Sequence, residues 1–140
     1  MKRGVVLAAV ALLAISFVAV SSIVGGWTAF LGTWVNVDCN TGGCTRFVIS
    51  GMGPDSLVFQ GYGACHPTDC TWSPAELVVY ADSVSDTQAF YASWISNEGF
   101  AVSIGTLRFQ GPCLVLTLYT RFVDGSGRSN YMTTDTFRRM

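Results

Sequence analysis

The feature that most constrains the fold is a series of eight short runs rich in β-branched and aromatic residues, each bounded by a turn sequence. The turns are built from Gly, Pro, Asn and Asp, as at residues 51–55, 97–99 and 124–127. Runs of this kind, with turn signals every 8–15 residues or so, predict β-strands joined by short connections. The predicted strands cover residues 33–37, 44–50, 56–62, 77–81, 87–96, 100–109, 113–123 and 131–139.

Eight sequential strands with short connections predict an all-β fold, an eight-stranded antiparallel up-and-down barrel. Closing the sheet on itself removes the exposed edges that an open sheet would have. A barrel of about eight strands is wide enough to be filled by side chains or to hold one small ligand. A two-sheet sandwich would give a similar spacing of strands and is the alternative architecture.

The first 24 residues have a different character. Lys2 and Arg3 precede a long apolar run without charge, and small residues follow at 19–22. This is the pattern of a secretory signal peptide, so we assign residues 1–24 to a hydrophobic export helix and residues 25–140 to the barrel domain. We therefore expect a protein that is secreted or held at the cell surface.

The same segment also allows a retained membrane anchor, because a helix over residues 4–24 would extend about 30 Å, enough to span a bilayer. A pilin-type leader, cut after Gly4, is a third possibility. We expect contact with a membrane only through residues 4–24, and only if this segment is not removed.

Five cysteines follow the leader. Cys39 and Cys44 are separated by four residues, and so are Cys65 and Cys70. Both pairs lie in turn-like sequence, where strand ends can approach to the Cα separation of about 5.5–6 Å that a disulfide needs. For an exported protein we therefore predict two local disulfides, Cys39–Cys44 and Cys65–Cys70. Cys113 is left over, as a buried thiol or as the site of an intermolecular bridge.

The net charge and the small number of reactive side chains disfavour several classes of function. The formal net charge is −1 and no cluster of Lys or Arg is present, so nucleic acid is not an expected partner. The single histidine, His66, stands beside Pro67 inside a predicted disulfide loop, which disfavours a catalytic triad. The spacing of Cys65, His66 and Cys70 does not match a structural zinc site. We predict a protein that is not an enzyme and uses no metal or cofactor.

Two short sequences carry a resemblance to a known family. Gly-Thr-Trp-Val-Asn at 32–36 resembles the Gly-x-Trp opening strand of the calycin barrels and is most similar to the avidin and streptavidin group. Asp-Thr-Phe-Arg at 135–138 is similar to the last strand of streptavidin. The resemblance implies an eight-stranded barrel in which the first and last strands pair, with Trp34 buried.

The resemblance also implies a ligand site inside the barrel. In the avidin group, an Asn on the first strand and an Asp on the last strand bind the ureido group of biotin, and these positions correspond to Asn36 and Asp135. Trp94 is the one tryptophan well placed to add an aromatic wall, and Tyr119 stands on the strand where the family has a further tryptophan. We expect Asn36 and Asp135 to face inward and to lie near each other and near Trp94 or Tyr119.

Two functions remain open at this stage. The first is an exported binding module that holds a small molecule in the barrel. The second is a structural subunit that assembles with copies of itself into a filament or surface layer. The 50% hydrophobic composition and the unpaired Cys113 support this second function. The aromatic segment at 27–31 either packs across the bottom of its own barrel or inserts into a neighbouring one.

Overall fold

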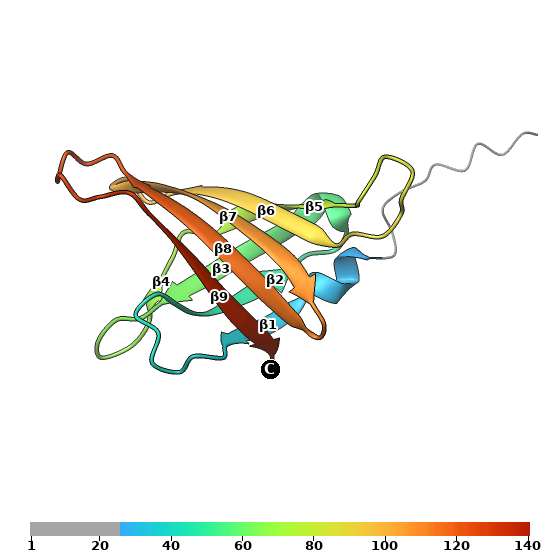
Figure 1. Ribbon diagram of the computed structural model, residues 1–140, viewed down its shortest axis with the longest axis horizontal. Coiled ribbons are helices and arrows are strands. Elements are labelled where there is room, and N and C mark those ends of the chain that lie inside the picture. Colours follow the sequence, from blue (N-terminus) through green and yellow to red (C-terminus); the bar gives the residue numbers. More distant parts are fainter. Residues whose placement is uncertain (1–25) are drawn as a thin grey trace, which may run out of the picture.

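The computed structural model describes residues 26–140, which form strands and two short 3-10 helices (Figure 1). The helices are η1, Trp27–Phe30, and η2, Pro54–Ser56. The strands are β1 (Gly32–Asn36), β2 (Cys44–Ser50), β3 (Leu57–Gly63), β4 (Cys70–Thr71), β5 (Ala75–Tyr80), β6 (Tyr91–Asn97), β7 (Ala101–Gln110), β8 (Cys113–Phe122) and β9 (Tyr131–Arg139). The predicted export helix at residues 4–24 lies outside the described residues.

The strands form one closed antiparallel barrel of eight strands, as the turn spacing predicts. Each barrel strand pairs with the next along the chain, and the two-residue β4 extends the sheet beside the end of β3. The seam closes where β1 pairs with β9, with Trp34 opposite Arg139 and Asn36 opposite Phe137. The predicted pairing of the first and last strands is therefore confirmed, and the sandwich is excluded.

Aromatic side chains fill one half of the barrel interior. Trp34, Phe47, Phe59 and Phe137 are each at most 1% exposed, because alternate residues of each strand point inward. Their rings form a continuous cluster, with Phe47 at 5.1 Å from Phe59 and 4.7 Å from Phe137 between ring centroids. Trp94 extends this cluster by stacking on Phe59 at 3.7 Å. This half of the barrel has no room for a ligand.

Helix η1 closes the same half from outside the sheet. Phe30 is fully buried against Phe109, with ring centroids 4.7 Å apart, and the indole N–H of Trp34 donates to the Phe30 carbonyl at 2.9 Å. The guanidinium of Arg139 lies over the Trp34 ring at 4.5 Å and donates to the carbonyls of Ala29 and Leu31. The aromatic segment therefore packs across its own barrel and forms the floor.

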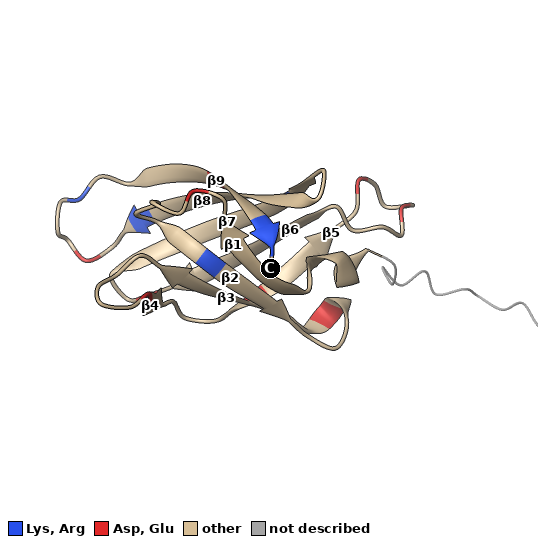
Figure 2. Ribbon diagram, turned by 90° about the horizontal axis from the view of Figure 1, so that it is seen from below, with Lys and Arg blue, Asp and Glu red and all other residues tan. Residues whose placement is uncertain are grey.

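Within residues 26–140, no helix combines the length and the hydropathy that are needed to cross a membrane. Most acidic residues lie in the connections between strands rather than on the barrel wall (Figure 2). At the open end of the barrel, opposite η1, lie the connections from β1 to β2, from β3 to β5, from β6 to β7 and from β8 to β9.

Candidate functional site: a cup at the open end of the barrel

The open end of the barrel contains a cavity of about 400 Å³, which we call the cup. Its walls come from the inner faces of β6, β7, β8 and β9 and from the segment that joins β3 to β5. Leu118 and Ala101 line its apolar part. Around them stand four aromatic residues, Trp72, Phe100, Phe122 and Tyr131, and five polar ones, Thr71, Ser96, Glu98, Ser103 and Thr120.

Trp72 takes its place in the cup because two glycines on β3 leave room for it. Gly61 and Gly63 occupy consecutive inward positions, and a Cβ atom on them would lie 2.4 Å and 2.7 Å from the indole. The backbone N–H of Trp72 donates to the Gly61 carbonyl at 3.0 Å, and the Gln60 amide donates to the Trp72 carbonyl at 2.6 Å. The indole therefore lies flat against the strand as part of the cup wall.

The indole N–H of Trp72 has no acceptor within residues 26–140, and it is not buried. A tryptophan that is partly buried usually finds a partner for this donor. In the cup, the donor is available to a ligand.

Glu98 holds the Trp72 segment against the turn between β6 and β7. One carboxylate oxygen accepts from the Ser73 backbone N–H at 2.9 Å and the other from the Ser73 hydroxyl at 2.8 Å. Among the side chains that line the cup, Glu98 is the only one with a charge. On the opposite wall, the hydroxyls of Ser103 and Thr120 lie 3.3 Å apart and share a hydrogen bond.

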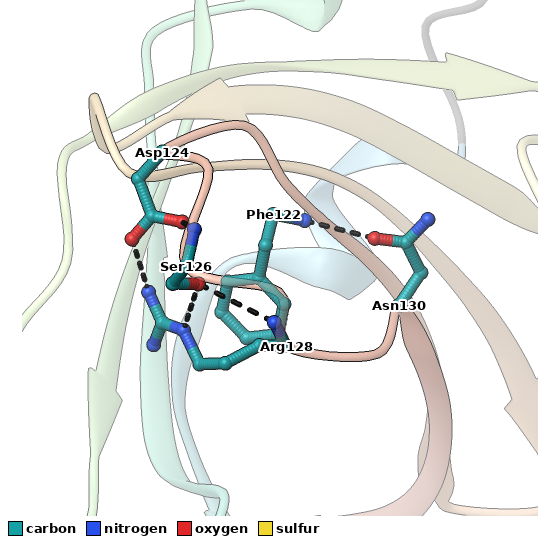
Figure 3. A network of polar contacts seen from close by, with 5 residues as sticks. All are labelled: Phe122, Asp124, Ser126, Arg128 and Asn130. Carbon is teal, nitrogen blue, oxygen red and sulfur yellow. Dashed lines mark hydrogen bonds and ion pairs between the residues drawn. The ribbon is translucent and has the colours of Figure 1, made fainter.

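The connection between β8 and β9 folds back beside the cup (Figure 3). Arg128 pairs with Asp124 at 2.6 Å, and its guanidinium lies 3.9 Å from the Phe122 ring centroid. Hydrogen bonds from Ser126, and then the charge of Arg128, lower the pKa of Asp124 to about 2. Asn130 fixes the return of the chain by accepting from the Phe122 backbone N–H at 3.0 Å. This connection thus forms an ordered rim on one side of the cup.

Of the four predicted site residues, Asn36 and Asp135 face inward on the paired strands β1 and β9, but neither lines the cup. The Asn36 amide donates to the Cys44 carbonyl and accepts from the Asp38 backbone N–H, both at 2.9 Å, so both ends of the amide are used within the fold. Trp94 lies in the aromatic core below the cup. Asp135 is half-buried on the inner face of β9, accepts no hydrogen bond within residues 26–140 and does not line the cup.

Tyr119 differs most from expectation, since it lies on the outer face of β8 and is 51% exposed. Its neighbours Leu118 and Thr120 are the buried residues of this part of the strand. Leu114, Val115 and Leu116 are apolar on both faces, so the sequence pattern of β8 does not reveal which set points inward.

One of the two predicted disulfides is confirmed and the other is wrong. Cys65 and Cys70 are bonded, with Cα atoms 5.4 Å apart, and a structural disulfide is typical of proteins in oxidising compartments. Cys39 and Cys44 are free thiols. A β-bulge between Cys44 and Arg46 turns Cys44 inward beside Phe47, while Cys39 stays exposed in the preceding connection.

Burial changes the acidity of the Cys44 thiol. It raises the pKa of Cys44 to about 12, and the thiol donates to the Arg46 carbonyl at 3.4 Å. Cys113 is free and half-buried at the start of β8, rather than fully buried as the apolar sequence around it suggests. Within the described part of the chain, no three His, Cys, Asp or Glu side chains lie close enough together to hold a metal ion.

Sequence reasoning missed the cup residues Trp72 and Glu98. The available signal was the pair of glycines at 61 and 63, because glycine inside a strand often marks the close approach of another group. Comparisons of the chain with models of protein families, with curated proteins and with solved structures found no match. The resemblance to the avidin group therefore rests on two strands and on the closed barrel between them.

Proposed function

We propose that this protein is an exported, non-enzymatic binding module that holds one small molecule in the cup. The observation that carries the proposal is a cavity of about 400 Å³ that combines aromatic walls with a few polar groups above a fully packed floor. Ligand sites in proteins are typically concave, mostly apolar and supplied with a small number of oriented polar groups, in volumes of about 300–1,000 Å³.

The polar groups of the cup support binding rather than catalysis. Its lining does not include His66, and histidine is the side chain that most often acts as a general base. Glu98 is already engaged by two hydrogen bonds from Ser73. The Cys65–Cys70 disulfide on the rim and the leader at residues 1–24 support an extracellular or cell-surface location.

A pair of variants tests the proposal. Ser103→Phe places a ring in the cup, whereas Ile104→Phe adds a ring on the outer face of the same strand. We expect calorimetric titration with biotin, cyclic ureas and other small ring compounds to find a ligand that binds in a one-to-one ratio. Affinity should fall at least about tenfold in Ser103→Phe, a loss of about 1.4 kcal/mol, and stay unchanged in Ile104→Phe. Equal affinity in wild type and Ser103→Phe contradicts the proposal.

A structural subunit is the second candidate, and one specific observation favours it. Four apolar side chains lie in register across adjacent strands on the outer wall, and each is between 48% and 68% exposed. They are Ile95, Ile104, Tyr119 and Met132. Neighbouring strands are about 4.8 Å apart, so this row crosses roughly 15 Å of the surface. A second copy of this chain would cover it by packing wall against wall.

Light scattering distinguishes this second function. Ile104→Arg places a charge in the row, and Thr106→Arg places the same charge on an exposed outer position of β7 outside it. If copies pack through the row, assemblies of the wild type dissociate in Ile104→Arg and persist in Thr106→Arg. A wild type that remains monomeric at high concentration contradicts the structural role and leaves the binding function in place.

A further inference from the structure

We propose that the ligand of the cup is an organic cation, an ammonium group with apolar substituents. The inference rests on the proposed binding function and names the chemical class that this cavity favours. The first observation that favours a cation is the negative charge at the cup. Glu98 is the only charged side chain in the lining of the cup, and Asp135, on the inner face of β9, is also acidic.

The aromatic walls favour the same class. Trp72, Phe100, Phe122 and Tyr131 all line the cavity, and the rings of Phe122 and Tyr131 lie 6.0 Å apart between centroids. The face of an aromatic ring carries negative potential and attracts a cation within about 6 Å of its centre. Apolar substituents on the ammonium group would gain contact with the same rings.

The rim shows that these rings accept a cation. The guanidinium of Arg128 lies 3.9 Å from the centroid of Phe122 and 5.4 Å from that of Phe100. Arg128 does not neutralise the cup, because its own counter-ion is Asp124 at 2.6 Å. The other ionic group nearby, Arg46, pairs with Asp69 at 3.8 Å and stacks on Tyr62. Glu98 is therefore left without a basic partner within residues 26–140.

Glu98 is also held in position. Its two hydrogen bonds from Ser73 fix the carboxylate beside the segment that carries Trp72. An ionised carboxylate offers about four acceptor sites, so two remain for a ligand. An anionic ligand would meet this charge at close range in a cavity partly shielded from water, which strengthens the repulsion.

The experiment compares a cation with a neutral compound of the same shape and with a smaller anion that carries the same tert-butyl group. Acetylcholine is the cation, neohexyl acetate is its neutral isostere, and the tert-butylacetate anion is the negative counterpart. With the full-length protein, we expect titration followed by nuclear magnetic resonance to show acetylcholine binding at least about tenfold tighter than neohexyl acetate, and no binding of the anion.

Three variants separate charge from structure. Glu98→Gln removes the charge and is expected to lower the ratio of the two affinities several-fold, while the aromatic walls retain the rest of the preference. Ser73→Ala removes a hydrogen bond from Glu98 but keeps its charge, so the preference for the cation should persist. Glu76→Gln, which removes an exposed carboxylate on the outer face of β5, is the matched control and should change nothing.

The outcomes are distinct for the two proposals. Equal or tighter binding of the neutral or anionic probe in the cup overturns the inference and leaves the binding function in place. A ratio of the two affinities that is unchanged in Glu98→Gln also overturns it. If neither these probes nor the ring compounds bind, the proposed function itself fails.

Discussion

Two glycines on β3 determine whether Trp72 can line the cup. Gly61 and Gly63 leave the space that the Trp72 indole occupies, and no larger residue fits at these two positions unless the indole moves. Gly105 leaves room for a tryptophan in the same way, because a Cβ atom there would lie 2.1 Å from the Trp94 ring. In both places a missing side chain on one strand creates the space that a tryptophan from another segment fills.

We predict that Gly61→Ala displaces Trp72 and destabilises the fold by about 1–3 kcal/mol, the usual cost of overpacking. The free energy of unfolding in urea and the tryptophan emission spectrum measure the two effects. Gly53→Ala is the control, because its nearest contact would be the Ser56 hydroxyl at 4.0 Å, and we expect a change within about 0.5 kcal/mol. Unchanged stability and emission in Gly61→Ala would show that the Trp72 indole does not lie against Gly61.

The cysteines yield a second prediction at this scale. In the native protein, alkylation at pH 8 should modify the exposed Cys39, while Cys44 reacts only after unfolding, because burial raises its pKa to about 12. The folded state is favoured while Cys44 is protonated, and this contribution declines as the pH rises above the ordinary value of 9.0 towards 12. Peptide mapping without reductant should find Cys65–Cys70, and a Cys39–Cys44 bond would contradict the structure.

At the scale of elements, the connection between β8 and β9 is ordered by its own side chains. Asp124, Ser126 and Arg128 form a closed set of hydrogen bonds that keeps Arg128 over Phe122 (Figure 3). One side of the cup rim is thus fixed by contacts within an eight-residue connection, residues 123–130, rather than by the barrel.

The lowered pKa of Asp124 gives this rim a defined response to acid. A carboxyl group whose pKa is lowered by folding supports the fold above its ordinary value, 3.8, and the support is lost as the pH falls towards 2. We expect the ring-proton shifts of Phe122 to be constant from neutral pH to about pH 4 and to change below it. In Asp124→Asn the acid transition should be absent, and its persistence there would assign it to another group.

The strands themselves were predictable because each is short, apolar and bounded by turn residues. The site was not predictable, because its residues are positioned by irregularities that the two-residue alternation of a strand does not reveal. The bulge at Cys44 reverses the side to which that thiol points. The break between β4 and β5 carries Trp72 inward, and β8 is apolar on both faces, which concealed the outward position of Tyr119.

At the scale of the whole molecule, closure depends on the seam between β1 and β9. Trp34→Ala should cost about 3–5 kcal/mol, as expected for a large aromatic side chain removed from a core. Arg139→Leu should cost about 1–2 kcal/mol, because it removes the stacking on Trp34 and the hydrogen bonds to η1.

Chemical denaturation measures both losses, and Arg138→Leu, on the exposed side of β9, is the control that should be neutral. A loss below about 1 kcal/mol for Trp34→Ala is incompatible with a closed barrel.

The seam also sets the order of events during biosynthesis. Because the partner of β1 is β9, and Arg139 reaches back 110 residues to Ala29, the floor cannot be completed until β9 has been made. Contacts between such distant segments make folding slow, and β1 and β8 each have an unpaired edge during that interval. A chain that ends at Asn130, before β9, keeps both edges open permanently, and we expect it to aggregate edge to edge.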